Sequence, residues 1–210
     1  MNTYHNSSTA IRRIQKDLKE IEREPVPGVS ICMPDISDPF ILHANLEIKD
    51  GIYEGILLHL IVHIPPDYPI TPPAVNICPG LNFGHKHHQH IFDDLRNGNS
   101  ICTDLISNFR GHFEAIDASG KPVKSGWTPS YTLSSVLIQL QVFFADPDFP
   151  LNSLPSKEDI QELRDHVKKF TTTITVNDGK TQTTVIHSYN NPYPPVHEIA
   201  DKSCETEGRR

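Results

Sequence analysis

The chain has 210 residues, of which 37% are hydrophobic, and carries a formal net charge of -7. This length suits one domain of about 150 residues with extensions, and an acidic chain without a basic stripe argues against nucleic acid as the main partner. No apolar run approaches the roughly 18 residues that span a membrane, and no leader-like segment starts the chain, so we expect a cytoplasmic protein, a nuclear protein or both, with no membrane partner.

The first predicted element is an amphipathic helix. Apolar residues recur at spacings of three and four from Ile11 to Ile21, residues 7–9 offer N-caps, and Pro25 ends the pattern. Charges of both signs occupy the other face, which by itself indicates a solvated surface. The basic residues of that face include Arg12, Arg13, Lys16 and Lys19.

After the helix the apolar period changes to two, which predicts an antiparallel meander with one covered face. The four expected strands are 29–31, 41–48, 56–64 and 74–77. The proline-rich segment before the last of them cannot lie inside a sheet, because proline has no N–H for the ladder. It therefore forms a stiff exposed loop that carries Ile70.

Residues 85–90 contain four histidines in six positions. Such a run suggests a metal site, but it has no companion cysteine pair and neither helical i, i+4 nor zinc-finger spacing. We therefore expect no metal, and favour a structural or catalytic use of one histidine.

The four cysteines are far apart and form no C-x-x-C pair, which argues against a zinc framework or a dense disulfide scaffold. They are Cys32, Cys78, Cys102 and Cys204. In a reducing compartment all four are expected to be free thiols. Cys102 follows a Gly/Asn turn in a short apolar run, where a sulfur is a nucleophile, a metal ligand or a buried filler.

The C-terminal half begins with a polar stretch at residues 110–126, which is long enough to be a functional or mobile loop. Two helices are expected next. Thr132 or Ser134 caps the first, and residues 156–159 resemble a capping box that opens the second.

The domain organisation follows from these elements. We expect a flexible N-terminus at residues 1–9, a core at 10–170 and an extension at 171–210. The extension is Thr- and Val-rich around an Asn-Asp-Gly turn, so it is expected to hold a β-hairpin at about 171–187, followed by a disordered tail.

Four motifs, in order, resemble the ubiquitin-conjugating enzyme family (E2, UBC fold) over about residues 10–170. They are Tyr53-Glu54-Gly55, Ile64-Pro65-Pro66-Asp67-Tyr68-Pro69 with Thr71-Pro72-Pro73, the segment Gly98-Asn99-Ser100-Ile101-Cys102-Thr103-Asp104-Leu105-Ile106, and Trp127-Thr128-Pro129. The resemblance implies an α+β, UBC-like fold with an N-terminal helix, a four-stranded antiparallel meander and C-terminal helices, to which the hairpin and tail are appended.

The resemblance also implies a chemistry for Cys102. In the family, this cysteine accepts ubiquitin or a ubiquitin-like modifier as a thioester from an activating enzyme (E1), in an ATP-dependent pathway, and passes it to a lysine or N-terminal amine of a protein substrate. No cofactor is implied. A thiolate suits this role because it both attacks an acyl group and leaves well.

The sequence departs from the family at the usual His-Pro-Asn, whose Asn supports the reaction. The nearest match is His88-Gln89-His90, so His90 takes the position of the Asn, and an imidazole N–H can donate to an oxyanion. A branch of the family that modifies N-terminal amines resembles this chain in carrying His there. Alternatively Asn97 or Asn99 substitutes. Asp148 lies where the family places an acidic residue near the acceptor amine.

The resemblance implies two partner surfaces. Ligases (E3) grip two apolar loops and the first helix, and the activating enzyme uses the same helix. By position these residues are Ile70, Pro129 and Ser130 on the loops, with Arg12, Arg13 and Lys16 on the helix. The longer interval at 110–126 could gate the cysteine, contact the acceptor or be a tolerated insertion.

Two rival hypotheses remain. The missing His-Pro-Asn would suit a catalytically inactive E2-like domain that binds ubiquitin or a partner protein, although Cys102 argues against it. A metal-binding protein built on the histidine run is the third interpretation.

Overall fold

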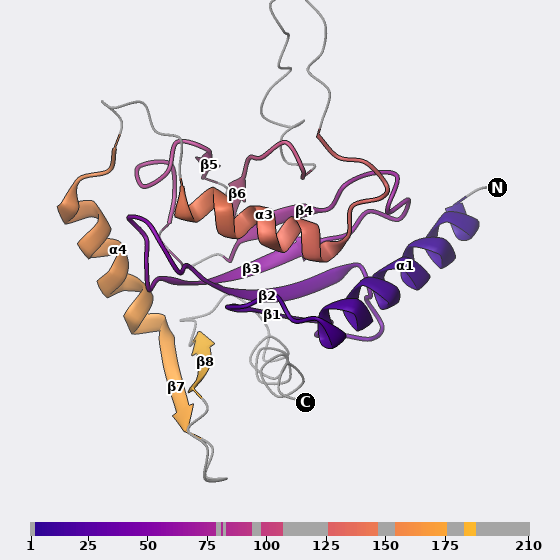
Figure 1. The fold of residues 1–210 in the computed structure, drawn as a ribbon, viewed down its shortest axis with the longest axis horizontal. Helices are drawn as coiled ribbons and strands as arrows, with labels where there is room; N and C mark the ends of the chain where they lie inside the picture. Colours follow the sequence, from indigo (N-terminus) through magenta and orange to yellow (C-terminus); the bar gives the residue numbers. More distant parts are fainter. Residues whose placement is uncertain are drawn as a thin grey trace, which may run out of the picture.

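The structure, a computed structural model, describes residues 3–78, 81, 83–93, 98–106, 126–146, 154–175 and 183–187. Within them, helix α1 precedes a six-stranded antiparallel sheet, and helices α3 and α4 follow it. In Figure 1, α3 lies across one face of the sheet, with α1 and α4 at opposite ends. The predicted α+β architecture is therefore confirmed. Asn97, Asp148 and most of the 110–126 segment lie outside the described residues.

Helix α1 spans Thr3–Arg23 and packs an apolar stripe onto the sheet. Ala10, Ile14 and Ile21 are buried, at the spacing of one helix face. The prediction of N-caps at residues 7–9 is wrong, since the helix begins before them and no glycine or proline interrupts it there. The first turns of α1 thus lie in the segment expected to be flexible.

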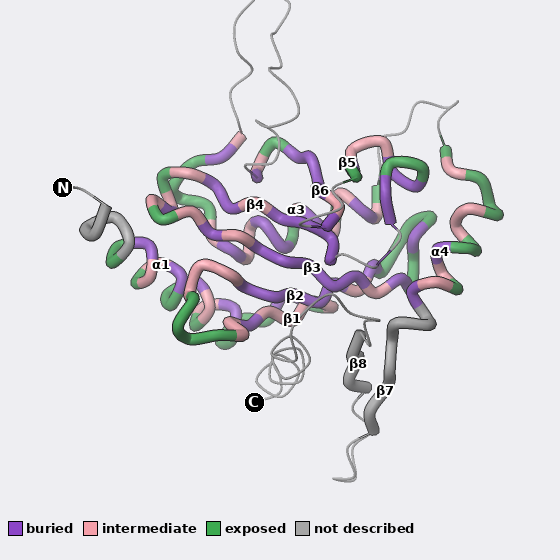
Figure 2. The backbone as a smooth tube through the Cα atoms, turned by 180° about the vertical axis from the view of Figure 1, so that it is seen from behind, coloured by how far each residue is buried: buried purple, intermediate pink, exposed green. Residues whose placement is uncertain are grey.

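The four predicted strands are present and pair in chain order. They are β1 (Val29–Cys32), β2 (Ile41–Glu47), β3 (Leu57–His63) and β4 (Ala74–Ile77). Alternate residues face one core: Leu42 and Ala44 lie opposite Val62 and Leu60 in the register, and all four are buried. Figure 2 shows this burial concentrated along the central strands and α3. The buried residues of α3 are Leu133, Val136, Leu137, Leu140 and Phe144.

Two further strands, β5 (Ile91–Phe92) and β6 (Asn99–Ile101), extend the sheet in the order β1-β2-β3-β4-β6-β5. Ile77 pairs with Asn99, and Ile91 pairs with Ile101. The predicted four-stranded meander is therefore present, but the sheet has two more strands than were predicted. Strands of two and three residues are too short to show an apolar alternation in the sequence.

The later helices are α3 (Leu133–Ala145) and α4 (Lys157–Phe170). Thr132 caps α3, with its hydroxyl accepting from the backbone N–H of Ser135. Ser156 caps α4, as its hydroxyl accepts from the N–H of Asp159 at 3.0 Å. Both capping predictions are confirmed. Among the described helices, none has the length and apolar character needed to cross a membrane.

Strands β7 (Thr171–Thr175) and β8 (Thr183–His187) form a second, two-stranded antiparallel sheet in which Thr173 faces Val185. They lie within the segment 171–187 where the hairpin was expected. β7 follows the end of α4 directly.

The described cysteines differ in redox state. Cys78 and Cys102 are free thiols. Cys32 is disulfide-bonded, which contradicts the expectation that all four cysteines are free.

Candidate active site

Cys102 follows the last residue of β6, and its backbone N–H donates to the carbonyl oxygen of His90 at 2.8 Å. This neighbour is fixed by the strand pairing. His90 precedes β5 and Cys102 follows β6, so the antiparallel register that joins Ile91 to Ile101 also brings these two residues together. The structure thus places two of the predicted catalytic residues side by side.

The Cys102 thiol is buried. The residue is only 6% exposed, and burial raises the pKa of its thiol to about 11. The thiol is therefore protonated near neutral pH, and the thiolate that forms during a transfer is a strong nucleophile, because intrinsic nucleophilicity rises with the pKa.

His88 packs next to His90 and holds its backbone. It is buried, its ring stacks on Phe143 with centroids 4.2 Å apart, and Tyr53 lies 6.2 Å away. Burial lowers the pKa of His88 to about 3, so the ring is neutral. Its Nδ1 then accepts the backbone N–H of His90 at 3.1 Å, which holds His90 at both its N–H and its C=O.

The side chain of His90 is half-buried, and its Nε2 lies 3.3 Å from Nε2 of Gln89. The alternative residue Asn99 donates one of its two side-chain amide N–H groups to the carbonyl of Phe83 at 3.0 Å, so part of its donor capacity is used within the fold. Gln89 belongs to none of the family motifs, and the sequence did not predict its contact with the His90 ring.

The predicted acidic residue Asp148 lies outside the described residues, just beyond α3. The described residue nearest to it is Asp146, whose N–H donates to the carbonyl of Val142 and closes the helix. Asp104, two residues after Cys102, accepts the N–H of Gly126 through its backbone carbonyl at 3.0 Å. This bond joins the two sides of the predicted insertion beside the cysteine.

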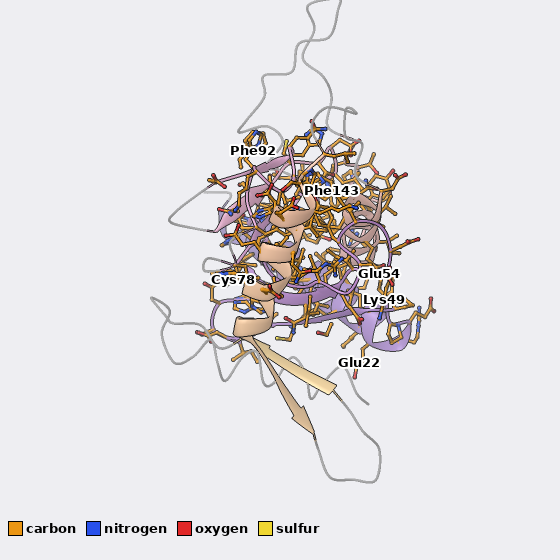
Figure 3. All side chains as sticks on the ribbon, turned by 90° about the vertical axis from the view of Figure 1, so that its left-hand side faces the viewer. Glu22, Lys49, Glu54, Cys78, Phe92 and Phe143 are labelled. Carbon is orange, nitrogen blue, oxygen red and sulfur yellow. The ribbon has the colours of Figure 1, made fainter. Side chains whose placement is uncertain are left out.

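The histidines of the run contact several different neighbours, and the rings of His88 and His90 lie with centroids 5.9 Å apart. His85 stacks on Phe92 at 5.8 Å and His88 on Phe143, and both phenylalanines are labelled toward the top of Figure 3. His87 is buried and its carbonyl accepts the hydroxyl of Tyr53. In the described part of the chain, no group of three or more His, Cys, Asp or Glu is arranged to hold a metal ion.

The loops predicted to meet ligases lie together at one end of the sheet. The indole N–H of Trp127 donates to the carbonyl of Pro69 at 2.8 Å, and this bond joins the two loops. Ile70 is 70% exposed beside that bond, and Pro129 and Ser130 are exposed on the other loop. The structure therefore brings these three predicted residues onto one surface.

The basic residues of α1 divide into two kinds. Arg12 and Lys16 are exposed, and they line a hollow on the helix surface together with Gln15, Lys19, Glu20 and Arg23. Arg13 instead turns inward. Its guanidinium donates to the carbonyls of Pro129 and Tyr131 and to the carboxylate of Asp17, so it ties α1 to the loop that carries Pro129.

Asp17 is a buried residue that the sequence assigned to the solvated face. It is fully buried and accepts from Arg13 Nε at 2.8 Å, from the Tyr68 hydroxyl at 2.6 Å and from the N–H of Leu133 at 3.3 Å. It joins α1, the proline loop and the start of α3. Its position three residues after Ile14 and four before Ile21, within the apolar stripe, is the signal that could have identified it.

Comparison with known proteins shows which family the chain resembles. A family model described as "Ubiquitin-conjugating enzyme" matches residues 13–177. The chain is 32% identical over 136 residues to "Ubiquitin-conjugating enzyme E2 Z" of Danio rerio, and 31% identical over 130 residues to the Homo sapiens protein of that name. It is 28% identical over 167 residues to "Ubiquitin-conjugating enzyme E2 13" of Arabidopsis thaliana.

The relatives differ in how much of their length is matched. The alignments cover 64% and 61% of this chain but only 36% and 32% of the two E2 Z proteins, so the chain spans about a third of their length. The plant alignment covers 78% of this chain and 92% of that protein. Because the family model extends over the second half of α1, the whole main sheet, Cys102 and both later helices, the chain belongs to the ubiquitin-conjugating enzyme family.

Proposed function

We propose that this chain accepts ubiquitin or a ubiquitin-like modifier as a thioester on Cys102 and transfers it to an amine of a protein substrate. The observation that carries the proposal is a free, buried thiol at the end of β6, on a residue whose backbone N–H bonds to the carbonyl of His90, inside a chain of this family. Cytoplasmic or nuclear location stays a prediction.

Two acyl transfers make up the reaction. The Cys102 thiolate first attacks the modifier's thioester on the activating enzyme; a C–S bond to Cys102 forms, and the activating enzyme's C–S bond breaks to release its thiolate. The substrate amine then attacks the new thioester, a C–N bond forms, and the bond to Cys102 breaks. The proton that the neutral amine loses as the C–N bond forms is taken up by the Cys102 thiolate, so the products are the amide and the Cys102 thiol.

The protein has to orient the amine and stabilise the negative charge that develops on the carbonyl oxygen during the second step. His90 is the residue proposed to donate to this oxyanion, since its backbone is held by His88 and by Cys102. Asp148 is proposed to orient the acceptor amine, on the family pattern alone.

Partner recognition is proposed for the two exposed surfaces. Ile70, Pro129 and Ser130 would meet a ligase, because loops fixed by a rigid scaffold commonly carry recognition. Arg12 and Lys16 would meet acidic residues of the activating enzyme or the ligase. Arg13 contributes indirectly, by holding the loop that carries Pro129.

The decisive experiment mixes the protein with activating enzyme, ATP and a modifier and separates the products on a gel without reductant. The wild-type chain is expected to form a thiol-sensitive adduct, and Cys102→Ala is expected to form none. Cys78→Ala is the matched control because this thiol is also free and buried, and it should load normally. If no modifier loads the wild type, the inactive binding domain is the better account and the proposal fails.

A further inference from the structure

The inference starts from the contact between two neighbouring side chains. The side-chain nitrogen of Gln89 lies 3.3 Å from Nε2 of His90. An amide nitrogen donates hydrogen bonds and does not accept them, so Nε2 of His90 must be the acceptor in this contact. In a neutral imidazole with Nε2 as the acceptor, the ring proton is on Nδ1.

Nδ1 is the ring nitrogen that can replace the side-chain N–H of asparagine. In both residues the nitrogen is bonded to Cγ, so each lies the same number of bonds from the backbone. The other ring nitrogen is one bond further out. A histidine with its proton on Nδ1 therefore offers an N–H donor at the depth where the family's Asn offers one, whereas the opposite tautomer presents a lone pair there.

The backbone of His90 is held as well, so the side chain that carries the donor starts from a fixed position. The N–H of His90 donates to Nδ1 of His88, and its carbonyl accepts from the N–H of Cys102. With both backbone groups bonded, the remaining freedom is the rotation of the ring and the placement of its proton. Gln89 acts on both of these.

We propose that Gln89 is a positioning residue that donates to Nε2 of His90 and thereby selects the tautomer whose Nδ1–H faces the developing oxyanion. The proposal rests on the proposed function in one respect, namely that an oxyanion forms at Cys102. The hydrogen bond and the tautomer are properties of the protein without a modifier, and they can be measured separately.

The first test measures the tautomer directly. Nitrogen-15 NMR of the imidazole rings distinguishes a protonated from an unprotonated ring nitrogen, and His90→Asn assigns the signal of His90. The wild type is expected to show a protonated Nδ1 and an unprotonated Nε2 at a pH where the ring is neutral. Gln89→Leu should move population to the Nε2–H form. A wild-type ring protonated on Nε2 overturns the proposal, even in a protein that forms no thioester.

The second test measures transfer from the preloaded thioester to free lysine in a single turnover. Gln89→Leu should leave loading intact and slow transfer about fivefold to tenfold, the effect of losing one hydrogen bond. His90→Ala should slow it by about a hundredfold, as for the loss of an oxyanion donor. Gln161→Leu is the matched control, since Gln161 is exposed on α4 and bonds only locally to Asp165 in the described contacts.

A double-mutant cycle separates positioning from a general structural role. An asparagine amide needs no tautomer, so the cost of Gln89→Leu should disappear in the His90→Asn background. An equal cost in both backgrounds would show that Gln89 only supports the fold, and the proposal would be wrong. If the wild type does not load at all, the proposed function fails while the NMR result still decides the contact.

Discussion

The junction around Asp17 and the histidine run near Cys102 both bury polar side chains. They reduce the cost of that burial in different ways: one by hydrogen bonds to a charged group, the other by keeping the group uncharged. The Asp17 carboxylate accepts from the side chains of Arg13 and Tyr68 and from a backbone N–H of α3. His88 instead lies among aromatic rings, and burial keeps its pKa near 3, so that it stays uncharged.

The difference has a physical cause. A buried carboxylate is tolerated only when donors surround it, so Asp17 fixes several elements in one arrangement. A neutral imidazole costs much less to bury. Even Nε2 of His87, which is buried without a hydrogen-bond partner among the described residues, is accommodated with a pKa lowered mainly by burial. The junction therefore fixes α1, the proline loop and the start of α3 in one arrangement, whereas His87 and His88 are buried as uncharged rings.

The largest expected effect on stability comes from removing the Asp17 carboxylate. Asp17→Ala leaves Arg13 without its carboxylate and removes an acceptor from Tyr68, so the free energy of unfolding should fall by about 3–5 kcal/mol. Urea unfolding followed by circular dichroism measures it. Glu22→Ala, an exposed acidic residue of the same helix, should change stability by less than about 0.5 kcal/mol. If the free energy of unfolding of Asp17→Ala fell by no more than that of Glu22→Ala, the junction would contribute little to stability.

The histidine run should make stability depend on pH. In the unfolded chain His88 takes up a proton near its ordinary pKa of 6.5, but in the folded chain it does so only near 3, so the unfolded state binds more protons between these values. Its stabilising contribution is complete above pH 6.5 and is lost as the pH falls toward 3, by up to about 1.4 kcal/mol per pH unit.

Substituting His88→Phe tests this assignment. The variant keeps the ring stacking on Phe143 and removes the titrating group, so the slope of unfolding free energy against pH between 6.5 and 4 should become shallower. A residual slope is expected from His63 and His87, whose pKa values are also lowered mainly by burial. An unchanged slope would mean that His88 is protonated in the folded chain.

Sequence reasoning succeeded where the pattern is local. The residues that define the apolar stripe of α1, each of the four strands of the meander and the caps at Thr132 and Ser156 lie close together in the sequence. Their interpretation needed no knowledge of distant contacts. The strands β5 and β6 were missed because two and three residues carry no periodicity.

It failed where burial depends on contacts far along the chain. Asp17 meets Tyr68 and Leu133, which are 51 and 116 positions away, and Arg13 meets the loop at Pro129 across a similar interval. By charge alone both residues belong on a solvated surface. The adjacency of His90 and Cys102 could be anticipated only from the family resemblance, and the Gln89 contact depends on side-chain geometry that spacing does not reveal.

The smallest expected effect distinguishes two neighbouring arginines of α1. Arg13→Lys removes a planar group that reaches Asp17 and two loop carbonyls at once, and a lysine ammonium cannot reproduce that fork. Unfolding free energy should fall by about 1–2 kcal/mol. The fluorescence of Trp127, the one tryptophan of the chain, should also change, because its loop is held by these bonds.

Arg12→Lys is the matched comparison, since Arg12 is exposed and donates only to Ser8 within its own helix in the described contacts. It should leave both stability and fluorescence unchanged while keeping the positive charge. Equal behaviour of the two variants would place Arg13 with the open basic residues after all. A difference would show that Arg13 holds the loop in its conformation, so that variants of Arg12 and Lys16 are the ones to use when the charge of α1 is tested in the proposed partner binding.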